Sequence, residues 1–417
     1  MTSPVRRHAI VIVGAGAAGI TAAALLKRAR PELDIALIDP AAFHYYQPAW
    51  TLVGGGSYDI ASTRREMRTL IPKGVQHLVE RVEGFEPEQN RLLLSGGRAV
   101  EYRMLIVAAG LQLDWHKIDG LPETLGKNGV SSNYAFEHAP YTWECLKNLR
   151  SGNALFTQPA MPIKCAGAPQ KALYLAADHF RRESLPVKSH FYTPGPAMFG
   201  VPFYAQALDK VVAEYDIAPH FGHTLVSVDG PNQKAQFEVV SNGEKQRVTQ
   251  PFDFLHVVPP QSAPDFIKQS PLADASGWMT VDKFTLQSPK FSNVFGFGDC
   301  TTTPNSKTAA AVRAQAPVVV ANVLKALLGN GGEQKYDGYA SCPLTTSRGK
   351  IMLAEFCYDG VVTPSFPLDP RIPRRSYWWL KKYYLPYLYW EQMLRGRLGP
   401  DWHATREFPA EVPAITA

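Results

Sequence analysis

The stretch Ala9-Ile-Val-Ile-Val-Gly-Ala-Gly-Ala-Ala-Gly19 joins an apolar strand to a glycine turn that opens a helix, and it is the clearest indication of the fold. The helix is predicted over 21–29, and a second strand follows over 34–39. Together they match a βαβ unit of ~30 residues. Helical stretches separate several further apolar runs, which predicts parallel sheets. These runs lie at 104–109, 154–157, 189–192, 255–258 and 294–297, and a polar alternation at 233–248 predicts an antiparallel meander.

The glycine turn also predicts a dinucleotide site. Glycines let the backbone approach a pyrophosphate, and the positive end of the following helix attracts its charge. Gly14, Ala15, Gly16 and Gly19 are therefore candidate cofactor contacts. Asp39 ends the next strand, 20 positions beyond Gly19, where an acid accepts hydrogen bonds from ribose hydroxyls. An ordinary glycine turn, an FAD site and an NAD site all remain open at this point.

Motifs further along the chain favour FAD. Asn293-Val-Phe-Gly-Phe-Gly-Asp299 resembles the late flavoprotein motif, in which a strand ends in Gly298-Asp299 and the aspartate binds the ribityl chain. Val107-Ala-Ala-Gly110 resembles the shorter motif between the two halves of the same domain. A helix is predicted from Ser306 as N-cap through Lys307 and Thr308, and its positive end would stabilise an anionic reduced flavin. A capped helix without a ligand is the alternative for this last element.

A second glycine motif is missing from the sequence. Two-domain flavin reductases that use a nicotinamide carry another GxGxxG after the first strand of their second domain. Here the strand at 154–157 is followed by Gln158-Pro-Ala-Met-Pro-Ile-Lys-Cys-Ala-Gly-Ala-Pro169. Because the prolines and the absent glycines leave no pyrophosphate cradle, NAD(P)H is not expected to be the electron donor.

One of the five cysteines has the surroundings of a reactive thiol. Cys165 stands just ahead of a helix predicted from Pro169 to Phe180, with Lys164 and Lys171 nearby. A helix N-terminus and cations lower a thiol's pKa, so we expect a thiolate over the flavin, with a buried inert cysteine as the alternative. No close CxxC pair and no Cys/His spacing suggests zinc, so no metal site is predicted. The other cysteines are Cys145, Cys300, Cys342 and Cys357. Of these, Cys145, Cys300 and Cys357 are expected to be structural.

Composition narrows the remaining classes. The chain has 417 residues, 19% of them charged and 45% apolar, so two domains with an extension and a charge-poor surface are expected. A formal charge of +6 does not indicate nucleic acid. Only eight residues precede the apolar run at Ala9, too few for a secretory or import segment of ~15 to 30 residues. We therefore expect the chain to stay in the compartment where it is made.

The C-terminal region has a different character after the linker at 329–332. Eight of the fourteen residues from Tyr377 to Trp390 are aromatic, and Pro386 interrupts them, so two short amphipathic helices are predicted. Six basic residues border or interrupt the aromatic stretch: Arg374, Arg375, Lys381, Lys382, Arg395 and Arg397. Interfacial aromatics and basic side chains predict binding to one leaflet, and a C-terminal cap on the flavin domain is the alternative. No run of ~20 uncharged apolar residues predicts a membrane span.

Taken together, the chain resembles the sulfide:quinone oxidoreductase family, in its mitochondrial and bacterial form with two redox cysteines. The resemblance covers nearly the whole chain, except that mitochondrial members carry an import segment. It rests on these stretches: Phe43-His-Tyr-Tyr-Gln-Pro-Ala-Trp50, Pro162-Ile-Lys-Cys-Ala-Gly-Ala-Pro-Gln-Lys171, Phe295-Gly-Phe-Gly-Asp-Cys-Thr301, Ser306-Lys-Thr-Ala-Ala-Ala-Val312, Tyr336-Asp-Gly-Tyr-Ala-Ser-Cys-Pro-Leu344 and Leu385-Pro-Tyr-Leu-Tyr-Trp-Glu-Gln-Met-Leu-Arg-Gly396.

The resemblance implies roles for individual residues. Cys165 and Cys342 would form the redox pair, Gln47 and Lys307 would touch FAD, and Val82 would contact the adenine part through its backbone. Hydrogen sulfide would open the Cys165–Cys342 bridge and leave a persulfide on Cys342. Electrons would pass through FAD to a quinone, and the sulfane sulfur to a small acceptor: sulfite, glutathione, cyanide or polysulfide.

The expected protein is a two-domain α/β flavoprotein of the glutathione-reductase type with a membrane-binding C-terminal extension. The FAD domain is predicted over 1–115 plus 285–335, the second Rossmann-like domain over 116–284 and the C-terminal region over 336–417. We expect a peripheral, monotopic inner-membrane enzyme that faces the cytoplasm. A type II NADH:quinone oxidoreductase and a non-catalytic FAD-binding membrane scaffold are the alternatives.

Overall fold

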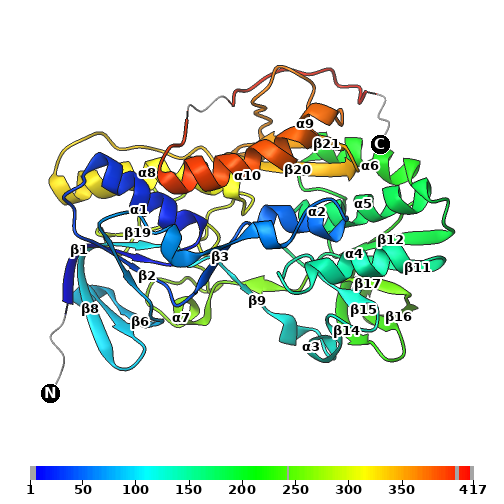
Figure 1. The fold of residues 1–417 in the computed structure, drawn as a ribbon, viewed down its shortest axis with the longest axis horizontal. Coiled ribbons are helices and arrows are strands. Elements are labelled where there is room, and N and C mark those ends of the chain that lie inside the picture. The colour runs from blue at the N-terminus through cyan, green and yellow to red at the C-terminus, as the bar shows by residue number, and fades with distance from the viewer. Residues whose placement is uncertain (1–5, 242–243, 400–402, 414–417) are drawn as a thin grey trace.

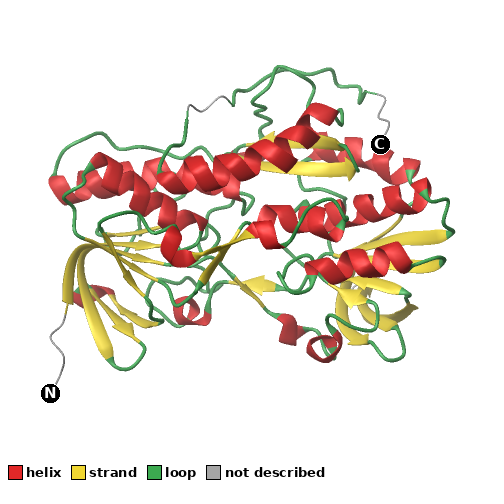
Figure 2. Ribbon diagram, viewed as in Figure 1, coloured by secondary structure: helices red, strands yellow, loops and turns green. Residues whose placement is uncertain are grey.

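The computed structural model describes residues 6–241, 244–399 and 403–413. Figure 1 shows two sheet-containing lobes side by side, with a layer of helices that runs over the first lobe. Helices on sheets confirm the predicted α/β class, and Figure 2 shows the same layering by element type. The helices of this layer are α1 (Ala17–Ala29), α8 (Ala309–Leu328) and the run that contains α10 (Leu385–Tyr387).

The first lobe is built on a sheet whose central strands are continuous apolar runs. Strand order is β5-β2-β1-β8-β7-β6, and β19 pairs in parallel with β8. Because helices and loops cover both faces, the central strands are almost fully buried, which is typical of parallel sheets. The strands are β1 (Arg6–Val13), β2 (Ile35–Ile38), β5 (Val75–Leu78), β6 (Val82–Glu86), β7 (Arg91–Leu94), β8 (Arg98–Val107) and β19 (Val294–Gly296).

The second lobe repeats the parallel arrangement. Its sheet has the order β10-β17-β11-β12-β13, and an antiparallel meander β14-β15-β16 lies beside it, which confirms the meander predicted around 233–248. The strands are β10 (Val130–Ser131), β11 (Gly152–Thr157), β12 (Val187–Thr193), β13 (Ala218–Phe221), β14 (His223–Asp229), β15 (Lys234–Ser241), β16 (Glu244–Pro251) and β17 (Phe254–His256). Its helices are α4 (Ala139–Asn148), α5 (Ala168–Arg182) and α6 (Pro202–Glu214).

The chain crosses between the lobes at a two-stranded antiparallel pair, β9 (Gln112–Leu113) with β18 (Gln261–Ser262). After β18, Ile267 and Met279 pack into the core of the first sheet. The predicted domain boundaries stay a prediction, and we propose that the first domain resumes near β18 rather than at residue 285. The remaining short elements are α2 (Trp50–Gly54), α3 (Leu121–Thr124), α7 (Asp265–Lys268), β3 (Phe43–Tyr45) and β4 (Arg64–Glu66).

A hairpin of β20 (Ala340–Ser347) and β21 (Lys350–Phe356) precedes the C-terminal helical run. The run continues from Arg375 to Arg395 across Pro386, so the prediction of two short helices is wrong. Its turns alternate between α-helical and π-helical geometry: α9 (Arg375–Trp379), a π turn at Leu380–Tyr384, α10, and a π turn at Leu388–Gln392. The wider turns on either side accommodate the proline ring, which has no N–H to donate and clashes with a regular α turn.

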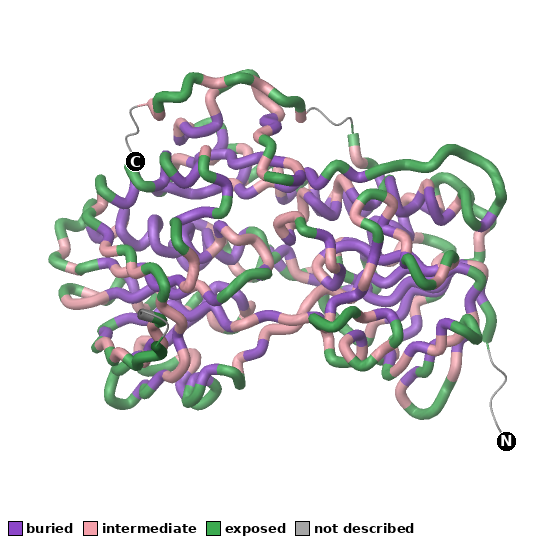
Figure 3. The backbone as a smooth tube through the Cα atoms, turned by 180° about the vertical axis from the view of Figure 1, so that it is seen from behind, coloured by how far each residue is buried: buried purple, intermediate pink, exposed green. Residues whose placement is uncertain are grey.

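Burial divides this run into two faces. Lys381, Tyr389 and Trp390 are at most 5% exposed, whereas Trp379, Tyr383 and Tyr387 are 59%, 55% and 52% exposed. Lys381 is therefore not among the basic residues available to a membrane surface, contrary to the sequence-based expectation. In Figure 3 the buried backbone lies in the sheets and the helices that face them, and exposed segments are mainly turns.

Among the described residues, helix α8 alone has the length and apolar composition of a membrane span, with mean hydropathy 1.4. However, 56% of that window is buried inside the molecule. It packs against α1 and the first sheet, as a core helix does.

Candidate active site

The glycine loop between β1 and α1 forms one end of a cavity. Gly14 has φ +99°, and a Cβ there would lie 2.5 Å from the carbonyl oxygen of Ala108. A Cβ on Gly19 would collide with the carbonyl oxygen of Gly14, so Gly19 holds the helix close to the strand instead of facing a ligand. Asp39 accepts hydrogen bonds from the backbone N–H of Ala15, at 2.6 Å, and of Ala41, at 2.8 Å. The acid is thereby fixed beside the loop.

The cavity has a volume of about 680 Å³, within the range of cofactor sites. Its lining brings together most of the predicted site residues: Gly14, Ala15, Gly16, Asp39, Gln47, Gly110, Cys165, Gly298, Asp299, Lys307 and Thr308. Val82 is not brought there. It is buried in β6, the sheet's edge strand, and does not line the cavity, so the expected adenine contact is not supported.

The lining suits a flavin dinucleotide. Gly16 borders the cavity, and a Cβ added there would meet no atom within 4 Å. The glycine therefore leaves open space beside the loop, which any side chain would fill. Asn133 also lines the cavity, and neither its amide oxygen nor its amide nitrogen has a hydrogen-bond partner although both are buried. Buried polar atoms are normally paired, so these two point to a polar ligand. A pyrophosphate at the glycine end and a polar ring near Asn133 match these features.

Two lysines cross the middle of the cavity beside Asp299. The Lys307 ammonium donates to the carbonyl of Thr301 at 2.9 Å and lies 4.5 Å from the Trp278 ring. Burial lowers the pKa of Lys307, and Asp299 opposes the shift. Burial likewise lowers the pKa of Lys164 to about 8, and its ammonium donates to Gln47. Both lysines can therefore bind acceptor oxygens inside the cavity.

Helix α8 opens onto the same cavity. Thr308 is its N-cap, and the Thr308 hydroxyl accepts from the N–H of Ala311 at 3.1 Å. The prediction of Ser306 as the cap is therefore wrong by two residues. The Ser306 hydroxyl instead lies 3.6 Å from the sulfur of Cys342. Ala309 and Ala310 also line the cavity, so the positive end of the helix borders it, as predicted.

Cys165 and Cys342 meet beside the cavity although 177 residues separate them in sequence. Cys165 has φ +52°, a left-handed conformation that is unusual outside glycine, and its N–H donates to the carbonyl of Lys307 at 2.8 Å. Cys342 lies in β20 and is fully buried. Their thiols are hydrogen-bonded, and the Lys171 ammonium donates to the sulfur of Cys165 at 3.1 Å. Strain and close contact at one residue are features of functional sites.

The surroundings push the pKa values of the two thiols in opposite directions. The hydrogen bond from Cys342 lowers the pKa of Cys165 well below its usual value, and Lys171 adds to the effect against burial. The hydrogen bond to Cys165, together with burial, raises the pKa of Cys342 well above its usual value. Cys165 is thus the thiolate and Cys342 the thiol of the pair.

Lys381 completes this cluster. It comes from the π turn at Leu380–Tyr384, lines the cavity and is 5% exposed. Burial lowers its pKa well below the usual value, and Lys171 adds to the shift, whereas Cys165 opposes it. From the sequence alone, Lys381 is expected to be a membrane-facing cation, and its burial overturns that expectation. One feature of the sequence is consistent with this burial: Lys381 lies one helical turn after Tyr377, which is itself buried.

The other three cysteines lie apart from the pair. Cys300 is buried, and burial raises its pKa to about 11. Burial also raises the pKa of Cys145 in α4. Cys357 follows β21 and contacts Asp337. None of the three lines the cavity.

The fold and this site define the class of flavin-dependent disulfide oxidoreductases. A family model described as pyridine nucleotide-disulphide oxidoreductase matches residues 8–148. The chain is 42% identical over 394 residues to the mitochondrial sulfide:quinone oxidoreductase of Mus musculus, covering 94% of this chain and 87% of that relative. It is 44% identical to the same enzyme of Dictyostelium discoideum, covering 93% and 86%. The chain belongs to the sulfide:quinone oxidoreductase family, and its cofactor is FAD.

A solved structure agrees with this assignment at the level of the fold. The sulfide:quinone oxidoreductase of Aquifex aeolicus has a TM-score of 0.76 and 19% identity, covering 95% of this chain and 93% of that chain. The rival family gives a shorter match. A type II NADH:quinone oxidoreductase of Mycobacterium tuberculosis is 36% identical over 25% of this chain and 23% of that relative.

Proposed function

We propose that this member of the family oxidises sulfide through Cys165 and Cys342 and delivers the electrons to a quinone through FAD. The observation that carries the proposal is Cys165 in the lining of a dinucleotide-sized cavity, with the buried Cys342 as its neighbour and the Lys171 ammonium 3.1 Å from its sulfur. The roles given to Gly14, Ala15, Gly16, Asp39 and the other predicted cofactor contacts belong to the same proposal.

The unequal pKa values assign the two cysteines. In the oxidised pair, hydrosulfide attacks the sulfur of Cys342, the S–S bond breaks, and Cys165 leaves as a thiolate. The bond that forms is the persulfide of Cys342, and no electron is gained or lost by the system as a whole. A thiol of lower pKa is the better leaving group, and the Lys171 ammonium 3.1 Å from Cys165 stabilises the departing charge.

When bound, FAD would supply a two-electron acceptor: once the sulfane sulfur has left Cys342, re-forming the Cys165–Cys342 disulfide releases an electron pair, which the flavin would take up and hand on to the quinone. The chain's part is to hold Cys165 against the cavity through the bond from its N–H to the carbonyl of Lys307. The N-terminus of α8 stabilises negative charge at that end of the cavity, and Lys164 and Lys307 are donors beside it. These groups make the cavity a better site for a reduced, anionic ring.

We place the quinone at the other end of the cavity, on the far side of the thiol pair. That end is lined mainly by apolar and aromatic side chains, together with Glu355, Lys381 and the hydroxyl groups of Ser341 and Ser365. Glu355 is held by the hydroxyl groups of Tyr339 and Ser365. Leu380, Tyr384, Leu385 and Leu388 of the helical run belong to the same lining, so the quinone would enter past this run.

We propose that the helical run binds one leaflet of the inner membrane as a peripheral, monotopic segment, with the enzyme facing the cytoplasm. The support is its exposed aromatic face, Trp379, Tyr383, Tyr384 and Tyr387, with Arg375, Arg395 and Arg397 also exposed. Aromatic rings favour the interface, and basic side chains reach the head groups. The mitochondrial location in the relatives' names also supports a membrane-associated enzyme.

For the sulfur acceptor, we propose a small anion. Cys342 is 0% exposed, and the Lys171 ammonium lies close to it. A narrow, positive approach favours sulfite or cyanide over glutathione, whose peptide would have to displace buried side chains. The kcat/KM values measured with each acceptor at saturating sulfide and quinone test this order.

The test of the proposed function is anaerobic reduction of the purified protein with sulfide. Sulfide should bleach the oxidised flavin spectrum, and added quinone should restore it. A flavin that stays oxidised under excess sulfide would identify the scaffold alternative instead.

A further inference from the structure

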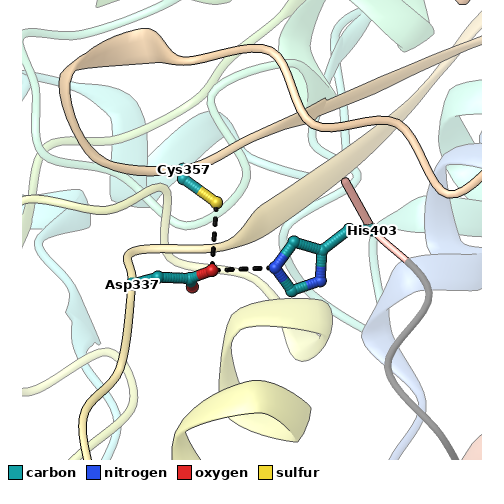
Figure 4. A group of neighbouring side chains, drawn as sticks. All are labelled: Asp337, Cys357 and His403. Carbon is teal, nitrogen blue, oxygen red and sulfur yellow. Dashed lines mark hydrogen bonds and ion pairs between the residues drawn. The ribbon is translucent and has the colours of Figure 1, made fainter. Parts of the chain in front are cut away.

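A cluster of side chains of the types that bind metals lies outside the cavity. Figure 4 shows Asp337, Cys357 and His403 pointing toward one another. Their donor atoms all lie within 4.8 Å of one another. Asp337 Oδ2 is 3.3 Å from Cys357 Sγ and 2.8 Å from His403 Nε2. Because Asp337 precedes β20, Cys357 follows β21 and His403 lies beyond the helical run, no local spacing predicts this cluster.

Neighbouring groups hold each of the three donors. The N–H of Tyr339 donates to the other carboxylate oxygen of Asp337 at 2.9 Å. The Tyr339 ring stacks on the His403 imidazole, with centroids 4.2 Å apart and an interplanar angle of 20°. The hydroxyl of Thr363 lies 3.3 Å from the Cys357 sulfur. Metal sites depend on such outer contacts, which fix the direction of each ligand.

We propose that Asp337, Cys357 and His403 bind a zinc ion with an open fourth position. Thiolate, imidazole and carboxylate are all zinc ligands, whereas Mg²⁺ and Ca²⁺ select oxygen donors. Tetrahedral zinc separates neighbouring donor atoms by about 3.4 to 3.6 Å. The sulfur–oxygen distance of 3.3 Å is already near this range, and the nitrogen–oxygen distance of 2.8 Å has to open slightly.

The hydrogen bonds of the cluster favour a cation. The Asp337 carboxylate accepts hydrogen bonds from His403 Nε2, from the N–H of Tyr339 and from the Cys357 thiol, so it is the acceptor on which the cluster converges. Zinc would replace the thiol proton of Cys357 and the hydrogen bonds that both neighbours make to the carboxylate, so its binding releases protons.

The site joins His403 to the two ends of the β20–β21 hairpin, which already meet through the bond from the N–H of Tyr358 to the carbonyl of Asp337 at 3.1 Å. Residues 403–413 run over the second lobe, where the carbonyl of Pro409 accepts from Arg371 at 2.8 Å and Phe408 contacts the ring of Phe203. Zinc would cross-link His403, in this tail, to both ends of the β20–β21 hairpin. Because that hairpin carries Cys342, the cross-link would stabilise the segment on which the redox pair depends.

The experiment measures zinc binding by the FAD-loaded full chain after treatment with a chelator, in competition with a chromophoric zinc indicator. Wild type should bind one zinc per chain, and Mg²⁺ should not displace it. Cys357→Ser and His403→Gln should each weaken zinc binding by at least a hundredfold. Cys145→Ser and His223→Gln, a thiol and a histidine outside the cluster, should leave the affinity unchanged. Retained FAD absorbance verifies that each variant is folded.

A second readout follows the tail itself. Zinc should slow tryptic cleavage after Arg406 in wild type and leave the rate unchanged in His403→Gln. The proposal is overturned if wild type binds no zinc, or if both cluster variants bind it as tightly as wild type. It is also overturned if Cys165→Ser abolishes zinc binding, which would locate the ion at the redox pair. None of these outcomes depends on sulfide oxidation.

Discussion

Two loops occupy the same topological position in the two parallel sheets. Residues 14–16 connect β1 to α1, and residues 158–167 connect β11 to α5. The first is short and glycine-rich, so backbone amides and a helix N-terminus face the cavity. The second is longer and carries Pro159, Pro162 and Cys165, and both Cys165 and Ala168, the first residue of α5, line the cavity.

The same architecture therefore serves two kinds of chemistry. In the first loop the absence of side chains is the functional feature, because a pyrophosphate needs close approach to the backbone. In the second loop one side chain is the functional feature. The left-handed backbone of Cys165 and its bond to the carbonyl of Lys307 hold the thiol at the cavity wall, where the first loop has only backbone.

The largest effect should come from removing the side-chain chemistry of the second loop and its partner. Cys165→Ala and Cys342→Ala should each reduce sulfide-dependent quinone reduction by several orders of magnitude, because a covalent relay fails when either end is lost. Cys145→Ala is the matched control and should be nearly neutral. Normal turnover by Cys342→Ala would show that the second cysteine takes no part.

The second loop should also fail as a nucleotide site. We expect NADH to reduce the bound flavin no faster than background, because 158–167 offers no glycine cradle. Stopped-flow bleaching by NADH and by sulfide, at equal concentration, measures the contrast directly. Rapid bleaching by NADH would mean that the two loops are more alike than their sequences indicate.

In the first loop, adding a single methyl group tests the cradle. Gly16→Ala should weaken FAD binding on the order of tenfold to a hundredfold, about 1.4 kcal/mol per factor of ten, since the new Cβ fills space the pyrophosphate needs. The melting temperature of the apoprotein should not change, because that Cβ meets nothing within 4 Å. Gly200→Ala, equally open but outside the cavity, is the control. Equal FAD affinity in both variants would contradict the role of Gly16.

The fold was largely predictable because its decisive features are local. Continuous apolar runs such as Ile10–Val13 and Val294–Gly296 become buried parallel strands, and the glycine turn admits no alternative at Gly14, whose φ is +99°. Local rules failed where a wider context decides. Pro386 was expected to break a helix, yet the helix continues, because the π turns on either side accommodate the proline ring.

The site was predictable only in part. The environment of Cys165 is local, with Lys171 one and a half turns along and a helix N-terminus next to it, so its reactivity was predicted from the residues alone. Its pairing with Cys342 is a tertiary contact, and it came from the family resemblance. Lys381 and the Asp337–Cys357–His403 cluster were missed because each depends on how distant segments pack, which no spacing in the sequence encodes.

The pH dependence of the second loop should change when its cation is removed. Lys171→Gln should raise the pKa of Cys165, because the ammonium stabilises the thiolate. The thiolate is the reactive form, so the acidic limb of the kcat/KM profile should move to higher pH, and activity at acidic pH should fall about tenfold or more while activity at alkaline pH recovers. Lys188→Gln, an exposed lysine of the same lobe, is the control. An unshifted profile would mean that Lys171 does not contribute to the pKa of Cys165.

The smallest effects should come from the exposed face of the helical run, which neither loop contacts. Deleting residues 374–417 would remove Tyr389, whose hydroxyl bonds to His44 at 2.7 Å, and so would damage the flavin domain as well. Surface substitutions separate the two roles. Trp379→Ser, Tyr383→Ser and Tyr387→Ser should each weaken binding to anionic vesicles by roughly fivefold, about 1 kcal/mol of lost apolar contact. Bleaching by sulfide should be unchanged, and turnover with a water-soluble quinone should be unchanged too. If a variant with all three substitutions bound vesicles as tightly as wild type, the exposed aromatic face would have to serve another contact. If that variant lost FAD, these rings would belong to the core.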